Sequence, residues 1–271
     1  MSPWRNLADA CGLGPHPFKG AGSTPAGDTF MNLILKSKKE VFFLVLLIFL
    51  SFFTRFYHLS YPNKVVFDEA HFGLYATKYL SGQYYFDIHP PLGKMLYGLI
   101  ALISGGMAGF EFEPYSEYPN FNYLYLRGFN AFIGCCFIVL IYFLIKEMGF
   151  SSKAALLASF FILLENSLLL ESRLILLNNF LLFFIFLSFY FFFKSEKQEL
   201  FSRKWHWFNF LTGVSLGLAT SVKILGAGAI ILLLFYNLII KEELAEKKKK
   251  ELKCRMLFYL VIPFLVFLTI F

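Results

Sequence analysis

The chain has 271 residues, of which 58% are hydrophobic, 20% aromatic and 16% charged, and its formal net charge is +7. Several separate apolar runs approach the ~20 residues that cross ~30 Å of hydrocarbon, which excludes a soluble domain and predicts an integral membrane protein. The positive charge does not indicate nucleic-acid binding, because the basic residues cluster beside apolar segments as juxtamembrane anchors. Four cysteines, two of them adjacent inside an apolar run, do not form a disulfide framework.

In chain order, residues 1–30 are rich in Gly, Pro, Ala and Ser, lack the order of a signal peptide, and predict a disordered tail. Met31, which follows, is an alternative start. We expect about seven apolar segments, at about 41–57, 92–109, 123–145, 154–170, 173–193, 209–240 and 256–271. The first should remain as a signal anchor. The last is apolar up to its end, which we interpret as a truncation in mid-span.

The positions of Lys and Arg predict the topology. The basic residues before 41–57 should stay cytoplasmic, which sends the loop of about 58–122 to the opposite side. If residues 92–109 also crossed, the basic linkers 194–204 and 241–255 would lie on the wrong side. We therefore predict residues 92–109 as a helix lying in or near the membrane plane.

The requirement that basic linkers stay cytoplasmic also predicts two short spans within residues 209–240. Lys223 would then lie at the external turn between them, with nearby glycines easing that turn. A single tilted helix is the alternative. It would bury Lys223 near the midplane, at roughly 2.5–3.5 kcal/mol, and would place the linker 241–255 outside. Two spans are the better interpretation.

One loop, "VVFDEAHFGLYATKYLSGQYYFDIHPPLGK" at residues 65–94, gathers five titratable groups: Asp68, Glu69, His71, Asp87 and His89. The predicted topology places it on one face with Arg127, Glu165, Glu171, Arg173 and Lys223. Each has a structural explanation of about equal weight when taken alone: Asp68 as a helix N-cap, Arg127 as an interfacial anchor, Lys223 as a turn residue. Together, an acid pair with cations at a bilayer surface suits an enzyme that handles a lipid-linked anion.

The loop closely resembles the first lumenal loop of the dolichyl-phosphate-mannose protein O-mannosyltransferases, which carries an Asp-Glu pair, a His two residues on and a His-Pro-Pro-Leu-Gly-Lys run. Four further stretches resemble family segments in family order across residues 41–240: "FTRFYHLSYP", "YLYLRGFNAFIG", "ESRLILLNNFLLFF" and "GVSLGLATSVKILG". Two positions depart from the family pattern. Asn178 stands where the family has Asp, and Ile224 where it has an aromatic residue.

The resemblance implies an α-helical polytopic membrane protein with the transmembrane module of a GT-C type glycosyltransferase at residues 31–271, lacking the family's C-terminal part and MIR domain. It implies an enzyme of the endoplasmic reticulum membrane with a cytoplasmic N-terminus. Such enzymes transfer mannose from dolichyl phosphate mannose to Ser or Thr hydroxyls of secretory proteins, with inversion. A homodimer or a heterodimer with a paralogue is the expected assembly. Alternatives are another GT-C transferase using a polyprenyl-phosphate sugar, and an inactive partner subunit or transporter remnant.

The chemistry suggests roles for these residues. A Ser hydroxyl needs a base, for which Asp68 is the candidate, with partial desolvation raising its basicity. The leaving phosphate needs charge stabilisation, for which a bidentate Arg127 is favoured and Arg55, Arg173 and Lys223 are secondary. Glu69 is expected to orient the acceptor or to pair with an Arg. The remaining loop candidates, for loop structure or substrate contact, are His71, His89, Pro90, Pro91 and Lys94.

A divalent metal is also conceivable on chemical grounds, since Asp68, Glu69, His71, Asp87 and His89 offer sufficient ligand types. Their spacing is not diagnostic of a metal site, and the family resembled is regarded as metal-independent. We therefore predict neither metal nor cofactor. The loop tyrosines suit either a sugar-binding surface or an interfacial aromatic belt, and the belt is favoured.

Overall fold

The computed structural model describes residues 38–105, 110–120, 122–239 and 246–271. The predicted disordered tail and Met31 lie outside the described residues. The described residues form helices, together with one isolated bridge between Lys64 and Glu117. In chain order these are α3 (Lys38–Phe56), α4 (Glu69–Ser81), α5 (Leu92–Ile103), α6 (Tyr123–Glu147), α7 (Ser152–Leu164), α8 (Asn166–Arg173), α9 (Asn178–Glu196), α10 (Arg203–Val222), a 3-10 turn (Ile224–Gly226), α11 (Ala227–Ile239), α12 (Glu246–Met256), a π turn (Leu257–Val261) and α13 (Ile262–Ile270).

Three helices are long and apolar enough to cross a membrane: Tyr123–Glu147, Asn178–Glu196 and Lys250–Ile270. A fourth span results if α7 and α8, which meet at 62°, count as one broken span. The chain is therefore an α-helical membrane protein, as predicted, but seven spans are not confirmed. The bend falls at Glu165, whose carboxylate accepts hydrogen bonds from the backbone N–H groups of Ser167 and Leu168 and so caps α8.

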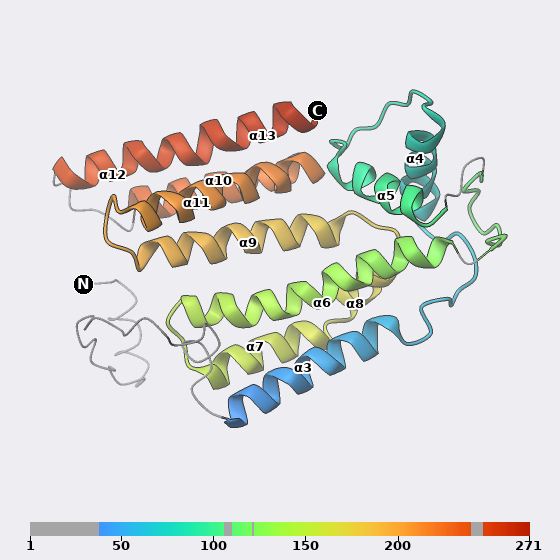
Figure 1. The fold of residues 1–271 in the computed structure, drawn as a ribbon, viewed down its shortest axis with the longest axis horizontal. Coiled ribbons are helices and arrows are strands. Elements are labelled where there is room, and N and C mark those ends of the chain that lie inside the picture. Colours follow the sequence, from blue (N-terminus) through green and yellow to red (C-terminus); the bar gives the residue numbers. More distant parts are fainter. Residues whose placement is uncertain (1–37, 106–109, 121, 240–245) are drawn as a thin grey trace.

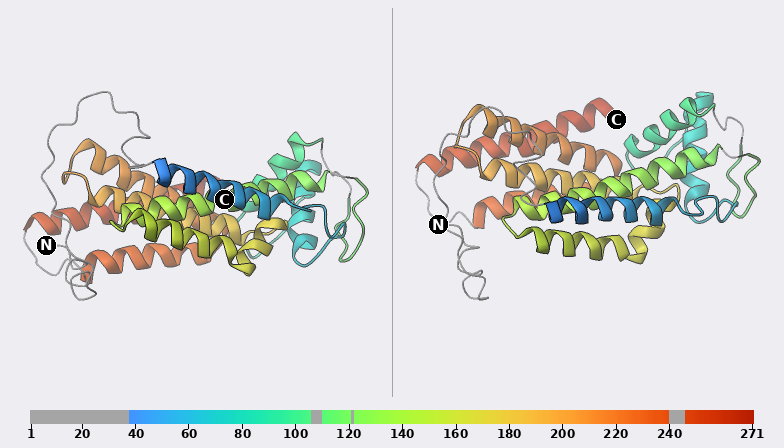
Figure 2. Two further views of the ribbon diagram at one scale, coloured as in Figure 1. Left: turned by 90° about the horizontal axis from the view of Figure 1, so that it is seen from below. Right: turned by 60° about the horizontal axis from the view of Figure 1, so that its bottom comes forward.

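The long helices run side by side and alternate in direction (Figure 1), with α6 packed between α3, α7 and α9, and α10 packed against α9 and α13. One end of this bundle carries α4, α5, the start of α6, α8 and the α10–α11 turn; we call it the loop end. The opposite end carries the basic ends and connections of the helices, and we call it the lysine end. Two further views keep α4 and α5 at the loop end (Figure 2). The predicted gathering of the 65–94 loop, Arg127, the α7–α8 break and Lys223 at one end is confirmed.

Two features of the helices agree with the predictions made from charge: the short length of α5 and the break at Lys223. The described part of segment 92–109 is α5, whose 12 residues span about 18 Å at ~1.5 Å per residue, too short to cross the hydrocarbon. It packs against α4, α6 and α10. Segment 209–240 is broken as predicted, because α10 ends before Lys223, which is extended, and a tight turn begins α11. A Cβ at Gly226 would lie 2.5 Å from the Ala219 carbonyl carbon, so this turn requires glycine.

Candidate functional site

The centre of the loop end is a buried ion pair between Glu69, the first residue of α4, and Arg127, one turn into α6. Both side chains are 0% exposed. Arg127 Nε lies 2.8 Å from Glu69 Oε1 and Nη2 lies 2.7 Å from Oε2, which is the bidentate geometry of a strong charge-assisted pair. Because the partners are 58 residues apart in sequence, the pair fastens the loop to the bundle.

The other donors of Arg127 bind the loop that precedes α4. Nη1 donates to the carbonyls of Leu59 and Pro62, at 3.3 and 2.9 Å, and Nη2 donates to the carbonyl of Lys64 at 3.1 Å. With the two bonds to Glu69, all five N–H donors of the guanidinium are used. The prediction that Arg127 is the favoured phosphate ligand is therefore corrected: it is buried and has no donor left.

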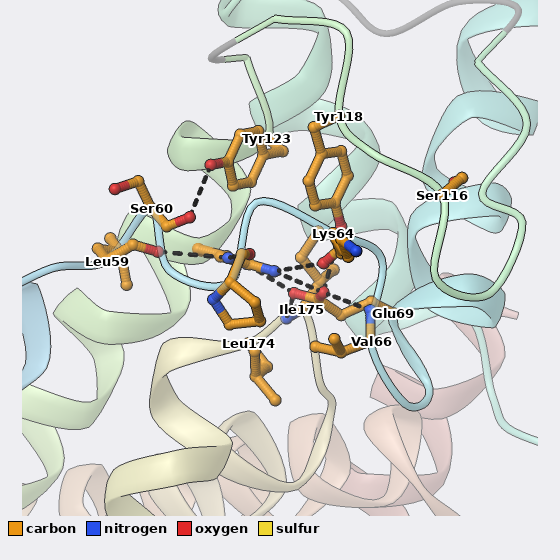
Figure 3. Close-up of polar contacts among 12 residues, drawn as sticks. Leu59, Ser60, Lys64, Val66, Glu69, Ser116, Tyr118, Tyr123, Leu174 and Ile175 are labelled. Carbon is orange, nitrogen blue, oxygen red and sulfur yellow. Dashed lines mark hydrogen bonds and ion pairs between the residues drawn. The ribbon is translucent and has the colours of Figure 1, made fainter.

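Glu69 is equally saturated and joins three parts of the chain (Figure 3). Besides Arg127 it accepts hydrogen bonds from the backbone N–H of Val66 and of Ile175, at 3.1 and 3.0 Å, and from the Tyr118 hydroxyl at 3.2 Å. Burial and the neighbouring carboxylate raise the pKa of Tyr118, which keeps its hydroxyl a donor. Of the two roles expected for Glu69, pairing with an Arg is the one that the structure contains.

Asp68 stands immediately before Glu69, yet its surroundings are different. It is half-exposed and occupies the N-cap position of α4 without making a side-chain cap. Its carboxylate forms no hydrogen bond or ion pair with any part of the chain that the structure describes. The preceding Phe67 has φ +53°, a left-handed conformation that is rare for a bulky residue. Asp68 is therefore the N-cap of α4 by position, as one explanation predicted, but its carboxylate does not cap the helix.

His89 lies near both cationic and anionic side chains. Burial lowers its pKa first, and the positive charge of Lys223 lowers it further, while Asp87 and Asp68 act in the opposite direction. His89 also lies close to Phe72 of α4, with the ring centroids 6.3 Å apart. The loop, α4 and the α10–α11 turn thus bring Asp68, His89 and Lys223 to the same end of the bundle.

The "HPPLGK" run closes the loop. Lys94 Nζ donates to Asp87 Oδ2 at 2.5 Å and to the His89 carbonyl at 2.6 Å, and its side chain is 2% exposed. Burial lowers the pKa of Lys94, which the Asp87 carboxylate opposes. Pro90 is buried and Pro91 is the N-cap residue of α5. Lys94 and the two prolines therefore hold the loop that presents His89, and the Lys94 ammonium is not free for a ligand.

The remaining predicted cations differ in what their donors do. Arg173 donates to the carbonyls of Thr54, Tyr57 and His58, at 2.9, 2.7 and 2.9 Å, so it caps the C-terminal end of α3. Arg55 is 1% exposed and lies between α3 and α6, out of reach of a ligand in this structure. Neither residue fits the secondary phosphate role proposed for it from sequence.

Lys223 fits a phosphate role better. It is half-buried, and its Nζ donates to Asn178 Oδ1 at 2.6 Å, leaving two ammonium donors. Asn178 in turn donates to Glu171 Oε1 at 2.9 Å. Because the direct partner is a neutral amide at one of the positions that depart from the family pattern, the Lys223 charge is oriented by it but not cancelled.

His71 lines a cavity whose lining does not include Asp68, His89 or Lys223. It is exposed, and this cavity of about 610 Å³ lies between α4 and residues 110–114. Sequence reasoning gave no role to Tyr118 or to the Asp87–Lys94 pair, since neither is marked by a motif spacing. Within the described ranges, no group of three or more His, Cys, Asp or Glu side chains is placed to hold a metal ion. The prediction of a metal-free site stays a prediction.

Together these features define a class: a polytopic helical membrane protein with a half-buried lysine at one end of its bundle, beside a carboxylate that has no partner among the described residues. The family model "Dolichyl-phosphate-mannose-protein mannosyltransferase" matches residues 45–271, and the chain belongs to this family. Dolichyl-phosphate-mannose–protein mannosyltransferase 2 of Candida albicans is 35% identical over 88% of this chain and 32% of its own length. Mannosyltransferase 6 of Saccharomyces cerevisiae is 36% identical, with the same shares covered. The chain thus spans about a third of the length of these relatives.

Two solved structures are similar. The S. cerevisiae protein O-mannosyltransferase Pmt1–Pmt2 complex bound to the sugar donor matches with a TM-score of 0.80 and 31% identity, over 87% of this chain and 33% of that chain. The oligosaccharyltransferase AglB from Archaeoglobus fulgidus, in complex with an inhibitory peptide and a dolichol-phosphate, matches with a TM-score of 0.64 over 89% of this chain and 30% of that chain. At 16% identity, the second likeness concerns the fold alone. The predicted fold class is confirmed.

Proposed function

We propose that this chain carries the donor-side chemistry of protein O-mannosylation, transferring mannose from dolichyl phosphate mannose to Ser or Thr hydroxyls of secretory proteins. The observation that carries the proposal is the Asp68 carboxylate, which is half-exposed and free of hydrogen bonds or ion pairs in the described chain, at the end where Lys223 lies. Family membership supports the donor and the acceptor class.

The reaction is a single displacement. The acceptor hydroxyl oxygen attacks the anomeric carbon of mannose while Asp68 takes the hydroxyl proton. The bond between that carbon and the phosphate oxygen breaks, and dolichyl phosphate leaves with both bonding electrons. Attack on the side opposite the leaving group inverts the anomeric carbon. A positioned base of this kind contributes about 10²–10⁴-fold in rate.

Lys223 is the proposed ligand of the donor phosphate, in place of Arg127. Its ammonium keeps two donors beyond the bond to Asn178, and hydrogen bonds to charged groups are worth about 1.5–3 kcal/mol each. Glu69 and Arg127 act as positioning residues, because they hold the turn that leads into Asp68. The leaving group is already an anion, so we propose no metal and no cofactor.

The assembly and location follow the relatives. The similar Pmt1–Pmt2 structure is a complex of two chains, which supports a homodimer or a dimer with a paralogue. We place the protein in the endoplasmic reticulum membrane, with a cytoplasmic N-terminus and Asp68 facing the lumen. The Lys and Arg residues at the opposite end, such as Lys38, Lys146 and Lys204, support this orientation.

Transfer of labelled mannose to a Ser/Thr-rich peptide tests the proposal, in membranes containing either this chain or its Asp68→Asn variant. Loss of transfer with Asp68→Asn supports the assignment. Transfer from a different polyprenyl-phosphate sugar instead would identify another GT-C transferase. No transfer from either protein, together with restored transfer when a full-length paralogue is co-expressed, would identify a partner subunit.

A further inference from the structure

At the lysine end, far from Asp68, α10 and the segment leading into α13 leave an open cavity of about 650 Å³. It is lined by Arg203, Lys204, His206, Trp207, Phe210 and Phe258. Four of these, at positions 203, 206, 207 and 210, lie on one face of α10, because they follow the i, i+3, i+4, i+7 spacing of a helix. None of the six belongs to the candidate site at the loop end.

The mouth of this groove is cationic. Arg203 and Lys204 are exposed, and neither makes an ion pair or hydrogen bond through its side chain within the described residues. Two other cations of this end are paired: Lys197 with Glu147 at 2.9 Å, and Arg255 with Glu251 at 3.1 Å. The groove therefore offers two uncompensated positive charges on neighbouring residues.

The wall of the groove is aromatic. Trp207 is 56% exposed and stacks on Phe210, with ring centroids 5.7 Å apart. Phe258 faces them from the segment before α13, and the ring of His206 lies 6.0 Å from that of Phe258. α10 packs between α9 and α13, which belong to two of the candidate spans. An exposed Trp beside Arg and Lys at the end of such a helix is the arrangement typical of a membrane–water interface.

The floor of the groove is closed by glycine contacts. A Cβ at Gly213 would lie 2.3 Å from the Phe258 carbonyl oxygen, and one at Gly217 would lie 2.6 Å from Val266. α10 therefore touches the π turn and α13 closely along these turns, so the groove does not extend beyond them toward the loop end. The groove thus places two cationic side chains beside an aromatic wall, which suits a ligand with an anionic head and a short apolar part.

We propose that this groove binds an anionic phospholipid, with the phosphate between Arg203 and Lys204 and the upper acyl chain against Trp207 and Phe210. Charge complementarity selects the occupant, because basic side chains at a membrane surface attract anionic headgroups. A second copy of this chain is a poor occupant, since a two-fold contact would bring the same cations face to face.

Native mass spectrometry of the purified chain in neutral detergent tests the proposal, with phosphatidylserine and phosphatidylcholine of equal chain length as probes. Phosphatidylserine should bind at least about tenfold more tightly. Arg203→Gln/Lys204→Gln should weaken it by about 30-fold. The matched control is Lys38→Gln/Lys39→Gln, which removes two exposed charges of the same sign at the same end and should change binding less than about threefold.

A phosphatidylserine with a photoreactive acyl chain should label the segments around Trp207 and Phe258, and Trp207→Ala should reduce this labelling. Equal weakening by the two double variants would overturn the proposal, because it would show general attraction to a basic surface. Equal binding of phosphatidylcholine would also overturn it. Soluble glycerophosphoserine competing as well as the intact lipid would assign the cations to a free phosphate ligand.

Discussion

Two adjacent carboxylates of the 65–94 loop have opposite surroundings. Glu69 is 0% exposed and accepts five hydrogen bonds, two from Arg127 and one each from Val66, Ile175 and Tyr118. Asp68 is half-exposed, and its side chain bonds to nothing in the part of the chain that the structure describes. The fold therefore occupies the acceptor oxygens of Glu69, whereas those of the preceding residue, Asp68, stay available to a ligand.

The comparison distinguishes a carboxylate that stabilises the fold, Glu69, from one that is available for a reaction, Asp68. A saturated buried carboxylate cannot take a substrate proton without losing the bonds that hold the loop, whereas a partner-free one can. The same distinction applies to the cations. Arg127 and Lys94 are tied down by loop carbonyls and carboxylates, while Lys223 has a single amide partner.

The largest effect should come from breaking the buried pair. Glu69→Ala leaves the Arg127 guanidinium buried without its carboxylate, which should lower the free energy of unfolding by about 3–5 kcal/mol. Thermal unfolding in detergent measures this, with Asp68→Ala as the matched control on the neighbouring carboxylate. Equal destabilisation by both substitutions would contradict the proposed division of roles.

Next in size is the effect of removing the phosphate contact proposed for Lys223. Lys223→Met should lower kcat/KM for dolichyl phosphate mannose by about 10–100-fold, since a hydrogen bond to a charged group is worth about 1.5–3 kcal/mol. Lys223→Arg keeps the charge and should retain more activity. If Arg127→Lys lowered kcat/KM for dolichyl phosphate mannose while Lys223→Met left it unchanged, the result would show that Arg127 binds the phosphate.

A smaller effect concerns the turn that positions Lys223. Gly226→Ala would place its Cβ 2.5 Å from the Ala219 carbonyl carbon, against backbone that cannot step aside, and should destabilise the protein by about 1–3 kcal/mol. The control is Gly228→Ala, where a Cβ would meet nothing within 4 Å. Thermal unfolding midpoints test this: Gly226→Ala should unfold at a lower temperature than Gly228→Ala. Similar midpoints would contradict the described turn.

The smallest effect should be the pH dependence contributed by His89. Its pKa in the folded protein lies below the usual 6.5, because burial and Lys223 disfavour the charged form. As the pH falls through 6.5, the unfolded chain takes up this proton before the folded one does, so stability decreases. His89→Gln should remove that part of the decrease, measured as unfolding between pH 7.5 and about 5.5; a steeper decrease would contradict the sign.

Much of the fold was predictable because charge and length constrain membrane helices strongly. The break at Lys223 followed from the cost of burying an ammonium, and the short α5 followed from the side on which basic loops lie. The break at Glu165 did not, since an apolar stretch with one acid does not reveal that the acid will cap a second helix. The number of spans stays a prediction, because length and composition single out three helices, or four with the bent pair, among the described residues.

The site was predictable in its residues but only partly in their roles. The motif indicated that Asp68, Glu69 and Arg127 matter, and chemistry assigned Arg127 to phosphate because guanidinium suits that ligand. Sequence does not show that the carbonyls of Leu59, Pro62 and Lys64 would occupy its donors, since that depends on how the loop folds back. Nor does it show that the Lys94 ammonium would close its own loop.

The central claim is the division between Asp68 and Glu69, and mannose transfer by two near-isosteric variants tests it most directly. Asp68→Asn and Glu69→Gln would be assayed with labelled dolichyl phosphate mannose, at equal amounts of folded protein and at a temperature where both stay folded. We expect Asp68→Asn to lose about 10²–10⁴-fold in rate with an unchanged unfolding midpoint, and Glu69→Gln to unfold at a lower temperature while keeping more activity. An active Asp68→Asn variant beside an inactive but fully stable Glu69→Gln variant would contradict the account.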